Sequence, residues 1–257
     1  MKIIQSLIIS LSLFTKIPVP HISWTKENMK YMIAAFPVAG AVIGILLLSW
    51  LKLCEILSFG NILFSAGITI IPILVTGGIH LDGFCDTVDA LASNSSLEKR
   101  QQIMKDPHAG AFAVIFAIIY LLAYFAIATE IPRHLSMVLS AGLLHIISRS
   151  TIGFGVLTFT PSGNSGLFYS LSESADKTRS TKVLYLIFAS CCAILIKILG
   201  VAAIFIPLST VLVAVGILQM AKKKFGGMSG DLSGYWLQIS ELTMLIVLVL
   251  IERMIIK

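Results

Sequence analysis

Long apolar runs recur along this chain and restrict what it can fold into. Seven runs of roughly 17 to 25 residues are separated by short polar segments, and about 20 apolar residues suffice for a helix to cross a membrane. A spanning segment must pair its own backbone groups, because the hydrocarbon core holds no water to bind them. We therefore expect an all-α fold, a polytopic helical membrane protein with about seven transmembrane helices. The expected spans are residues 31–51, 62–79, 109–129, 135–159, 183–199, 201–220 and 238–256.

The composition agrees with a membrane protein. Of the 257 residues, 57 % are hydrophobic and 12 % are charged, whereas a soluble domain carries about 25 % charged residues. No polar stretch is long enough for a soluble domain, so residues 1–257 are expected to form a single integral-membrane domain. The net charge of +6 comes from basic residues between the runs. It indicates membrane topology and contact with anionic lipid, and not binding of nucleic acid.

Basic residues are distributed unequally between the two sides of the expected membrane. One side carries Lys16, Lys26, Lys30, Lys99, Arg100, Lys105, Lys177, Arg179, Lys182, Lys222, Lys223 and Lys224. The opposite side has Lys52, Arg133 and Lys257. Segments rich in lysine and arginine stay in the cytoplasm, so the first side is predicted to be cytoplasmic. All six aspartates of the chain lie on that side too, which predicts a cytoplasm-facing polar site.

Three of these aspartates follow the second apolar run at a helical spacing. Asp82, Asp86 and Asp89 are related as i, i+4 and i+7, which places them within an arc of roughly 60° on a helix. Like charges on one stripe repel each other, and a bound cation would relieve that repulsion. Oxygen ligands suit Mg²⁺, which completes its shell with water and substrate phosphate. The stripe therefore predicts a membrane-embedded, Mg²⁺-dependent catalytic domain that acts on a diphosphate.

A solvated loop is the alternative interpretation of these aspartates. Two features favour a site: Gly77-Gly78 breaks the apolar run where the polar residues begin, and Asp82 is expected to be the N-cap of a new helix. His80 stands two residues before Asp82. It is a candidate general base for an attacking hydroxyl, with a structural role as the alternative.

Two charged residues lie inside apolar runs, where a charge is costly. Arg149 is expected two to three turns from the cytoplasmic end of its span, and Glu241 about one turn into the last span. Arg149 can clamp a phosphate or carboxylate group of a ligand; alternatively, the two residues form an ion pair. His145 lies one turn before Arg149 and is interpreted as a hydrogen-bonded core histidine.

Further candidates lie in the polar segments. Arg100 and Lys105 are close to the aspartates in sequence and could hold phosphate oxygens, or they are topology signals alone. Asp106 is either a further metal or catalytic residue or the cap of the next helix.

A glycine-rich segment, Gly226-Gly227-Met228-Ser229-Gly230-Asp231, precedes the last span. Such a segment can bring backbone N–H groups close to an anion. Gly227, Gly230, Asp231 and the following Glu241 are therefore candidates for binding substrate.

Taken together, these segments resemble the cobalamin synthase family, adenosylcobinamide-GDP ribazoletransferase. The most specific match is Gly77-Gly78-Ile79-His80-Leu81-Asp82-Gly83-Phe84-Cys85-Asp86-Thr87-Val88-Asp89. Other matches are Lys16-Ile17-Pro18-Val19-Pro20, Phe36-Pro37-Val38-Ala39-Gly40, Ile103-Met104-Lys105-Asp106 with Gly110, Arg149, and the glycine-rich segment followed by Glu241. The resemblance covers nearly the whole chain in the family's order.

The resemblance implies a multi-pass, Mg²⁺-dependent transferase of the bacterial inner membrane that acts late in vitamin B12 assembly. Such an enzyme joins a corrinoid nucleotide, adenosylcobinamide-GDP, to α-ribazole or its 5′-phosphate, and releases GMP with adenosylcobalamin or its 5′-phosphate. The three aspartates of the stripe would hold Mg²⁺ at the diphosphate. His80 or a carboxylate would accept the proton of the attacking hydroxyl, and Arg149 and Lys105 would balance the charge of the transition state.

The chain departs from the family pattern after Asp106. The family usually has Asp-Ser-Arg-Ile-Gly where this chain has Asp106-Pro107-His108-Ala109-Gly110. If the family's arginine binds phosphate, His108 would do so only when protonated.

Other functions share some of these features. CDP-alcohol phosphotransferases and membrane prenyltransferases also bind a diphosphate through aspartates and Mg²⁺, but they need a second aspartate group, and Asp231 stands alone here. A divalent-cation transporter would place acidic residues near the bilayer midplane and often has an inverted repeat. The pair Gly40 and Gly44 allows close helix packing and would permit a homo-oligomer.

Overall fold

The computed structural model describes residues 2–164 and 166–255. No strand is present among these residues, and one isolated bridge pairs Pro161 with Met228. The helices are α1 (Lys2–Phe14), α2 (Lys26–Met29), α3 (Met32–Ile56), α4 (Asn61–Thr76), α5 (Ile79–Ala92), α6 (Leu97–Ile103), α7 (Ala111–Thr129), α8 (Leu135–Thr158), α9 (Leu167–Ser174), α10 (Lys177–Leu199), η1 (Val201–Ile204), α11 (Phe205–Phe225) and α12 (Gly230–Ile255).

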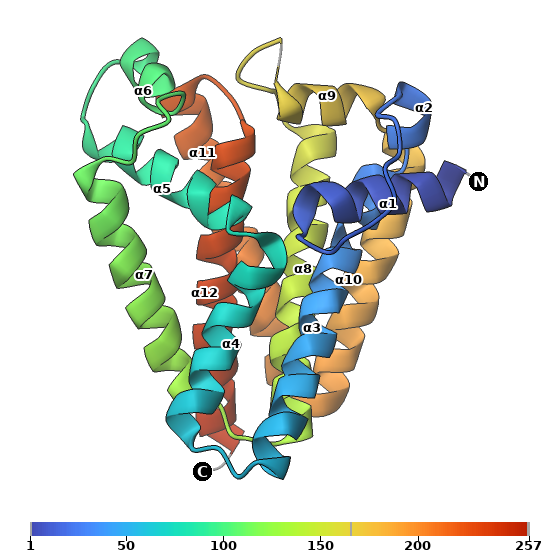
Figure 1. Ribbon diagram of the computed structural model, residues 1–257, viewed down its shortest axis with the longest axis vertical. Helices are drawn as coiled ribbons and strands as arrows, with labels where there is room; N and C mark the ends of the chain where they lie inside the picture. The colour runs from blue at the N-terminus through green and yellow to red at the C-terminus, as the bar shows by residue number, and fades with distance from the viewer. Residues whose placement is uncertain (1, 165, 256–257) are drawn as a thin grey trace.

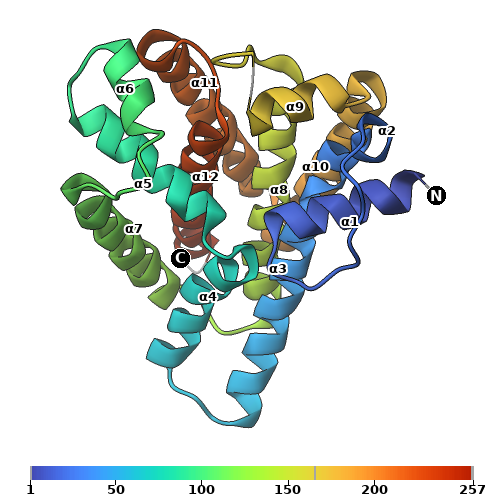
Figure 2. The same ribbon diagram turned by 45° about the horizontal axis from the view of Figure 1, so that its top comes forward.

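The expected transmembrane helices are present. In the described part of the chain, six helical segments are long and apolar enough to cross a membrane: α3, α7, α8, α10, η1 with α11, and α12. The remaining expected span, residues 62–79, corresponds to α4. α4 meets the same criterion only together with α5, and a bend of 92° separates these two helices. We treat α4 as the span, because α5 turns away across one end of the bundle (Figures 1 and 2). The predicted all-α, polytopic fold is confirmed.

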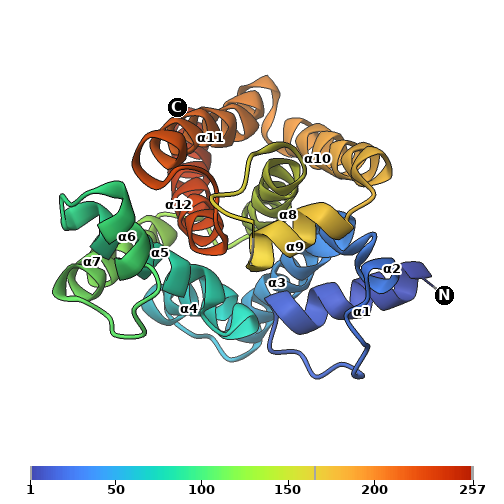
Figure 3. The same ribbon diagram turned by 90° about the horizontal axis from the view of Figure 1, so that it is seen from above.

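α8 is the central helix of the bundle. Seen from above, α3, α10, α11 and α12 surround it (Figure 3). α3 packs against it through glycines: Gly44 lies against Gly142, and a Cβ added at Gly40 would come within 3.0 Å of the His145 carbonyl group. The predicted packing role of the Gly40 and Gly44 pair is confirmed inside the chain. Both glycines are buried against α8, so they are not available for pairing with a second copy.

Two glycines produce the turn between α4 and α5. Gly77 and Gly78 have φ angles of +62° and +79°, a conformation that glycine adopts without strain. Gly78 is the N-cap of α5, and the Asp82 N–H donates to the Gly78 carbonyl oxygen at 2.8 Å. The predicted N-cap role of Asp82 is wrong, because the glycine pair already starts the helix and places Asp82 in its first turn.

Two of the polar segments between the expected spans contain helix. The segment 160–182 includes α9, which has Phe168 and Leu171 buried on one face. The segment 221–237 is largely helical as well: α11 continues to Phe225, and α12 starts at Gly230. Helices can extend past the apolar run that predicts them, because their polar ends project beyond the hydrocarbon core.

Candidate active site

The backbones of α5 and α12 touch where the two helices cross. A Cβ at Gly83 would lie 2.7 Å from the Asp231 carbonyl oxygen, and one at Gly234 would lie 2.8 Å from the His80 carbonyl oxygen. The two glycines therefore permit an approach that any larger residue would prevent. This crossing brings Asp231, at the start of α12, beside the acidic stripe of α5.

The carboxylates at this crossing influence one another. Asp82 is exposed, whereas Asp86 and Asp231 are half-buried. Burial, followed by the negative charges of Asp82 and Asp231, raises the pKa of Asp86 to about 6. A cation would relieve this crowding, and a donor set made only of oxygens fits Mg²⁺.

The crossing does not form a closed metal cage. Within residues 2–164 and 166–255, no three His, Cys, Asp or Glu side chains are grouped as ligands of one ion. Mg²⁺ usually takes only one or two protein carboxylates and obtains its other ligands from water and substrate phosphate. An open arrangement of carboxylates therefore fits an ion that binds together with a diphosphate.

Asp89, the third member of the stripe, caps a different helix. Its Oδ2 accepts a hydrogen bond from the Gly110 N–H at 2.6 Å, and its Oδ1 accepts one from the Ala113 N–H at 3.0 Å. These donors lie at the N-terminus of α7, where N–H groups have no partner within the helix. Spacing along one helix could not predict this contact, because Gly110 lies 21 residues after Asp89.

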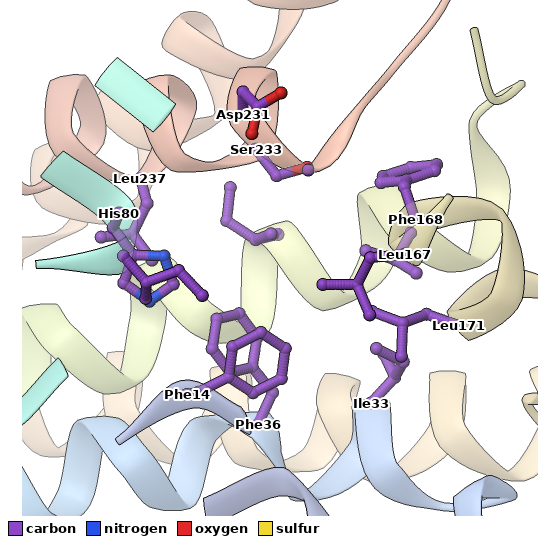
Figure 4. A pocket seen from close by; sticks show the side chains of 14 residues that line it. Phe14, Ile33, Phe36, His80, Leu167, Phe168, Leu171, Asp231, Ser233 and Leu237 are labelled. Atoms are coloured by element: carbon purple, nitrogen blue, oxygen red, sulfur yellow. The ribbon is translucent and has the colours of Figure 1, made fainter. Parts of the chain in front are cut away.

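His80 is buried beside the crossing and lines two cavities. One is an apolar cavity of about 100 Å³ that also contacts Phe14, Phe36 and Asp231 (Figure 4). The other is a small polar pocket that reaches Arg149 in the bundle. Burial lowers the pKa of His80 to about 3, so its imidazole is neutral near pH 7. Its Nε2 has no hydrogen-bond partner in the described part of the chain.

A further cavity shares Asp231 with the apolar cavity. It has a volume of about 220 Å³, and both Lys105 and Asp231 line it. Arg100 is half-buried on α6, and its side chain is not among those lining this cavity. Asp106 is exposed in the segment after α6, where its carboxylate accepts a hydrogen bond from the His108 N–H at 3.0 Å and has a lowered pKa as a result.

The glycine-rich segment uses part of its backbone to hold a neighbouring loop. The Met228 N–H donates to the Thr160 carbonyl oxygen at 3.0 Å. A Cβ at Gly227 would lie 2.7 Å from the Pro161 carbonyl oxygen, so only glycine permits this contact. Gly230 lines the apolar cavity beside His80. Anion binding by this segment stays a prediction, and the Met228 N–H is already used.

Arg149 and Glu241 form the ion pair that was one of the two predicted alternatives. Nη1 of Arg149 lies 2.7 Å from Oε1 of Glu241, and the two side chains are only 1 % and 4 % exposed. Ser148 donates a hydrogen bond to the same oxygen at 2.8 Å, and Nδ1 of His145 lies 2.9 Å from it. The cluster joins α8 to α12 inside the bundle, and it supports the interpretation of His145 as a polar core residue.

Comparison with known proteins connects this arrangement to one family. Residues 6–249 match the family model described as cobalamin-5-phosphate synthase. The chain belongs to the cobalamin-5-phosphate synthase family. An adenosylcobinamide-GDP ribazoletransferase of Lachnoclostridium phytofermentans is 37 % identical over 259 residues, which cover 100 % of this chain and 97 % of the relative.

Two other relatives carry the same name. The protein of Clostridium botulinum (strain Alaska E43 / Type E3) is 33 % identical, with 94 % of this chain and 95 % of the relative covered. The protein of Geobacillus thermodenitrificans is 31 % identical, with 88 % of each chain covered. No solved structure matches this chain.

The predicted site residues of this cobalamin-5-phosphate synthase family member fall into groups in space. The crossing gathers Asp82, Asp86 and Asp231, and the cavities beside it bring in His80 and Lys105. A second group, Arg149 with Glu241, lies deeper in the bundle. Arg100, Asp106 and Gly227 belong to neither group.

Sequence reasoning missed the contribution of α9 to the site. Phe168 and Leu171 of this helix line the cavity beside His80. The signal was present, since apolar residues three positions apart share one face of a helix. It was too short to stand out between much longer apolar runs.

Proposed function

We propose that this protein joins adenosylcobinamide-GDP to α-ribazole or its 5′-phosphate, forming adenosylcobalamin or its 5′-phosphate and releasing GMP. The family match and the names of the curated relatives support this reaction. The acidic crossing of α5 and α12, with two cavities that Asp231 lines, is the structural observation that carries the proposal. Family membership does not favour the other diphosphate-binding transferases or a cation transporter.

The reaction forms one phosphate ester bond and breaks one phosphoanhydride bond. The ribazole hydroxyl attacks the phosphorus next to the cobinamide arm, and GMP leaves with the electrons of the broken P–O bond. The hydroxyl proton moves to an acceptor on the protein. Asp231 and the neutral imidazole of His80 line the same cavity beside the crossing, and we assign proton acceptance to one of these two groups.

Mg²⁺ is the proposed cofactor. Asp82 and Asp86, with Asp231 nearby, supply the carboxylate oxygens that would hold it. When bound, Mg²⁺ neutralises the diphosphate and stabilises the leaving GMP. Lys105 lines the further cavity that Asp231 also lines, where its ammonium group can bind phosphate oxygens. Arg149 forms an ion pair with Glu241. We therefore assign Arg149 a structural role, in which it joins α8 to α12 next to the site.

Turnover by purified protein in liposomes tests this proposal. With both substrates and Mg²⁺, chromatography should show GMP and a cobalamin product in equal amounts. Omission of Mg²⁺, or the change Asp82→Ala, should lower turnover by a factor on the order of 10² or more. Glu173→Gln changes an exposed acidic residue of α9 and is the matched control. Near-normal turnover by Asp82→Ala would contradict the metal role.

We also infer that the polar end of the bundle faces the cytoplasm of a bacterial cell, with the protein in the inner membrane. Lys222, Lys223 and Lys224 lie in the last turn of α11 at this end, as expected for a cytoplasmic segment. α12 runs from this end to the opposite one (Figure 1). Alkaline phosphatase fused after α12 should therefore be active, and a fusion in the segment 104–110 should be inactive. The reverse pattern would contradict this orientation.

A further inference from the structure

The apolar cavity beside His80 has Asp231 and Ser233 together at one end, its polar end, whereas His80 lies in the side wall next to Phe14 and Phe36 (Figure 4). Residues of α1, α3, α5, α8, α9 and α12 line it, and Ile79, Leu167 and Gly230 are its exposed members (Figure 4). Its polar side chains are His80, Asp231 and Ser233. Its other side chains are apolar, among them Phe14, Phe36, Val156 and Phe168.

The size of the cavity suits a small aromatic ring system. Its volume is about 100 Å³, whereas one water molecule needs roughly 10–15 Å³ of such space. A bicyclic ring fits this room, and the macrocycle of a corrinoid does not.

The polarity of the wall discriminates between the two bases that the proposed reaction brings to the protein. Guanine carries hydrogen-bond donors and acceptors along its edges, and burying them against apolar side chains would leave them unpaired, which is costly. A benzimidazole has an almost entirely apolar edge, which an apolar pocket accepts. Phe14 and Phe36 add aromatic faces to the wall, with ring centroids 4.1 Å apart.

We propose that this cavity binds the benzimidazole base of the ribazole substrate, with its ribose at the polar end. This inference rests on the proposed function and names the subsite for one of its two substrates. A carboxylate and a hydroxyl at this end, with the imidazole of His80 in the side wall, match the hydroxyl groups of a sugar. Asp231 belongs both to this end and to the acidic crossing, so a base in the cavity places the ribose hydroxyls next to the diphosphate site.

His80 is the residue that this arrangement assigns to contact with the ribose. It is 7 % exposed, and its Nε2 has no partner among the residues that the structure describes. Its ring packs to one side of the Phe14 and Phe36 rings, at centroid distances of 6.2 Å and 5.9 Å. A buried polar atom without a partner is costly, and a ligand hydroxyl would satisfy it.

A substitution that fills the cavity gives the first test. Val156→Phe places a larger side chain in its wall, and Val211→Phe makes the same change on the exposed face of α11. Val156→Phe should raise the KM for α-ribazole by about tenfold or more and leave the KM for adenosylcobinamide-GDP unchanged. Val211→Phe should change neither value. An unchanged KM for α-ribazole in Val156→Phe would overturn the proposal.

A substitution that enlarges the cavity gives a test that misfolding cannot imitate. Phe168→Ala removes a ring from the wall. This variant should use a ribazole analogue with a tricyclic naphthimidazole base better than the unmodified protein does. Its preference for this analogue relative to α-ribazole should rise by about tenfold. An unchanged preference in a variant that still turns over would contradict the assignment.

Equilibrium binding separates this inference from the proposed reaction. The intrinsic fluorescence of α-ribazole reports its binding to the protein in liposomes without any turnover. Binding by the unmodified protein and a loss of affinity in Val156→Phe would support the cavity even if no cobalamin forms. Equal binding by both proteins would overturn the cavity assignment while leaving a positive turnover result intact.

Discussion

Arg149 on α8 and Glu241 on α12 are joined by a contact of 2.7 Å inside the bundle. Both side chains are almost fully buried, so neither charge has water to stabilise it. Ser148 and His145 complete the surroundings of the carboxylate. The pair therefore links two helices that also line the proposed site. We expect its loss to lower mainly the free energy of unfolding.

Removing one member of this pair should destabilise the protein strongly. Arg149→Met leaves the Glu241 carboxylate buried without its partner, which should lower the free energy of unfolding by about 3–5 kcal/mol. Thermal unfolding in detergent can be followed with a thiol-reactive dye, because Cys54 and Cys191 are buried. The double variant Arg149→Met with Glu241→Met removes both charges and should recover part of the loss. A double variant no more stable than the single one would contradict this account.

The two glycines of α3 should differ in their tolerance of a methyl group. A Cβ at Gly40 would meet the His145 backbone within 3.0 Å, whereas at Gly44 the nearest atom, Cα of Gly142, would be 3.4 Å away. Gly40→Ala should therefore lower stability by about 1–3 kcal/mol. Gly44→Ala is the matched control and should cost less than about 1 kcal/mol. Equal melting temperatures for the two variants would show that α3 and α8 are not in such close contact.

Asp89→Asn should lower stability more than Asp82→Asn does. Asp89 accepts two N–H groups at the start of α7, one with each carboxylate oxygen. In asparagine one of these oxygens is replaced by an NH2 group, which donates and cannot accept. The expected loss is about 1 kcal/mol, as for other helix caps. Asp82 is exposed, and its neutralisation removes repulsion within the stripe, so its variant should keep or gain stability. The melting temperatures of the two variants decide this, and an unchanged value for Asp89→Asn would exclude the capping role.

Mg²⁺ binding should strengthen as the pH rises. The pKa of Asp86 is raised to about 6, so this carboxyl holds its proton at lower pH and becomes an anionic ligand only above that value. The apparent Kd for Mg²⁺ should fall between about pH 5 and about pH 7, by up to tenfold for each pH unit below the pKa. Calorimetry of the protein with Mg²⁺ measures this.

Two variants make that pH test specific. Asp86→Asn should flatten the dependence. Asp106→Asn should retain it, because the hydrogen bonds from His108 lower the pKa of Asp106 and keep it ionised through this range. A flat profile in the unmodified protein would remove Asp86 from the metal site.

The membrane spans were predictable from consecutive residues. The length and polarity of a run are local properties, and about 20 apolar residues are enough to identify a spanning helix. All seven expected spans have a helical counterpart in the described residues. Their ends were predicted less well, because polar turns such as the first turns of α12 carry no apolar signal.

The acidic stripe was predictable for the same reason, and its surroundings were not. Helical periodicity alone places Asp82 and Asp86 on one face. Asp231 joins them only because Gly83 and Gly234 let α5 and α12 touch, and this contact joins segments about 150 residues apart. Helical spacing likewise predicted Asp89 as a metal ligand. Its contact with Gly110 was not predicted, because it joins residues of two different helical segments.

Local sequence thus accounts for the kind of fold and for the chemical character of the site, since helix formation, membrane partition and charge spacing all depend on neighbouring residues. The crossing of helices accounts for the rest. It pairs Arg149 with Glu241, gives Asp89 a capping role and forms the cavity between α9 and His80. These features depend on how closely two helices that are far apart in the sequence can approach. The size of the side chains at the contact sets that distance.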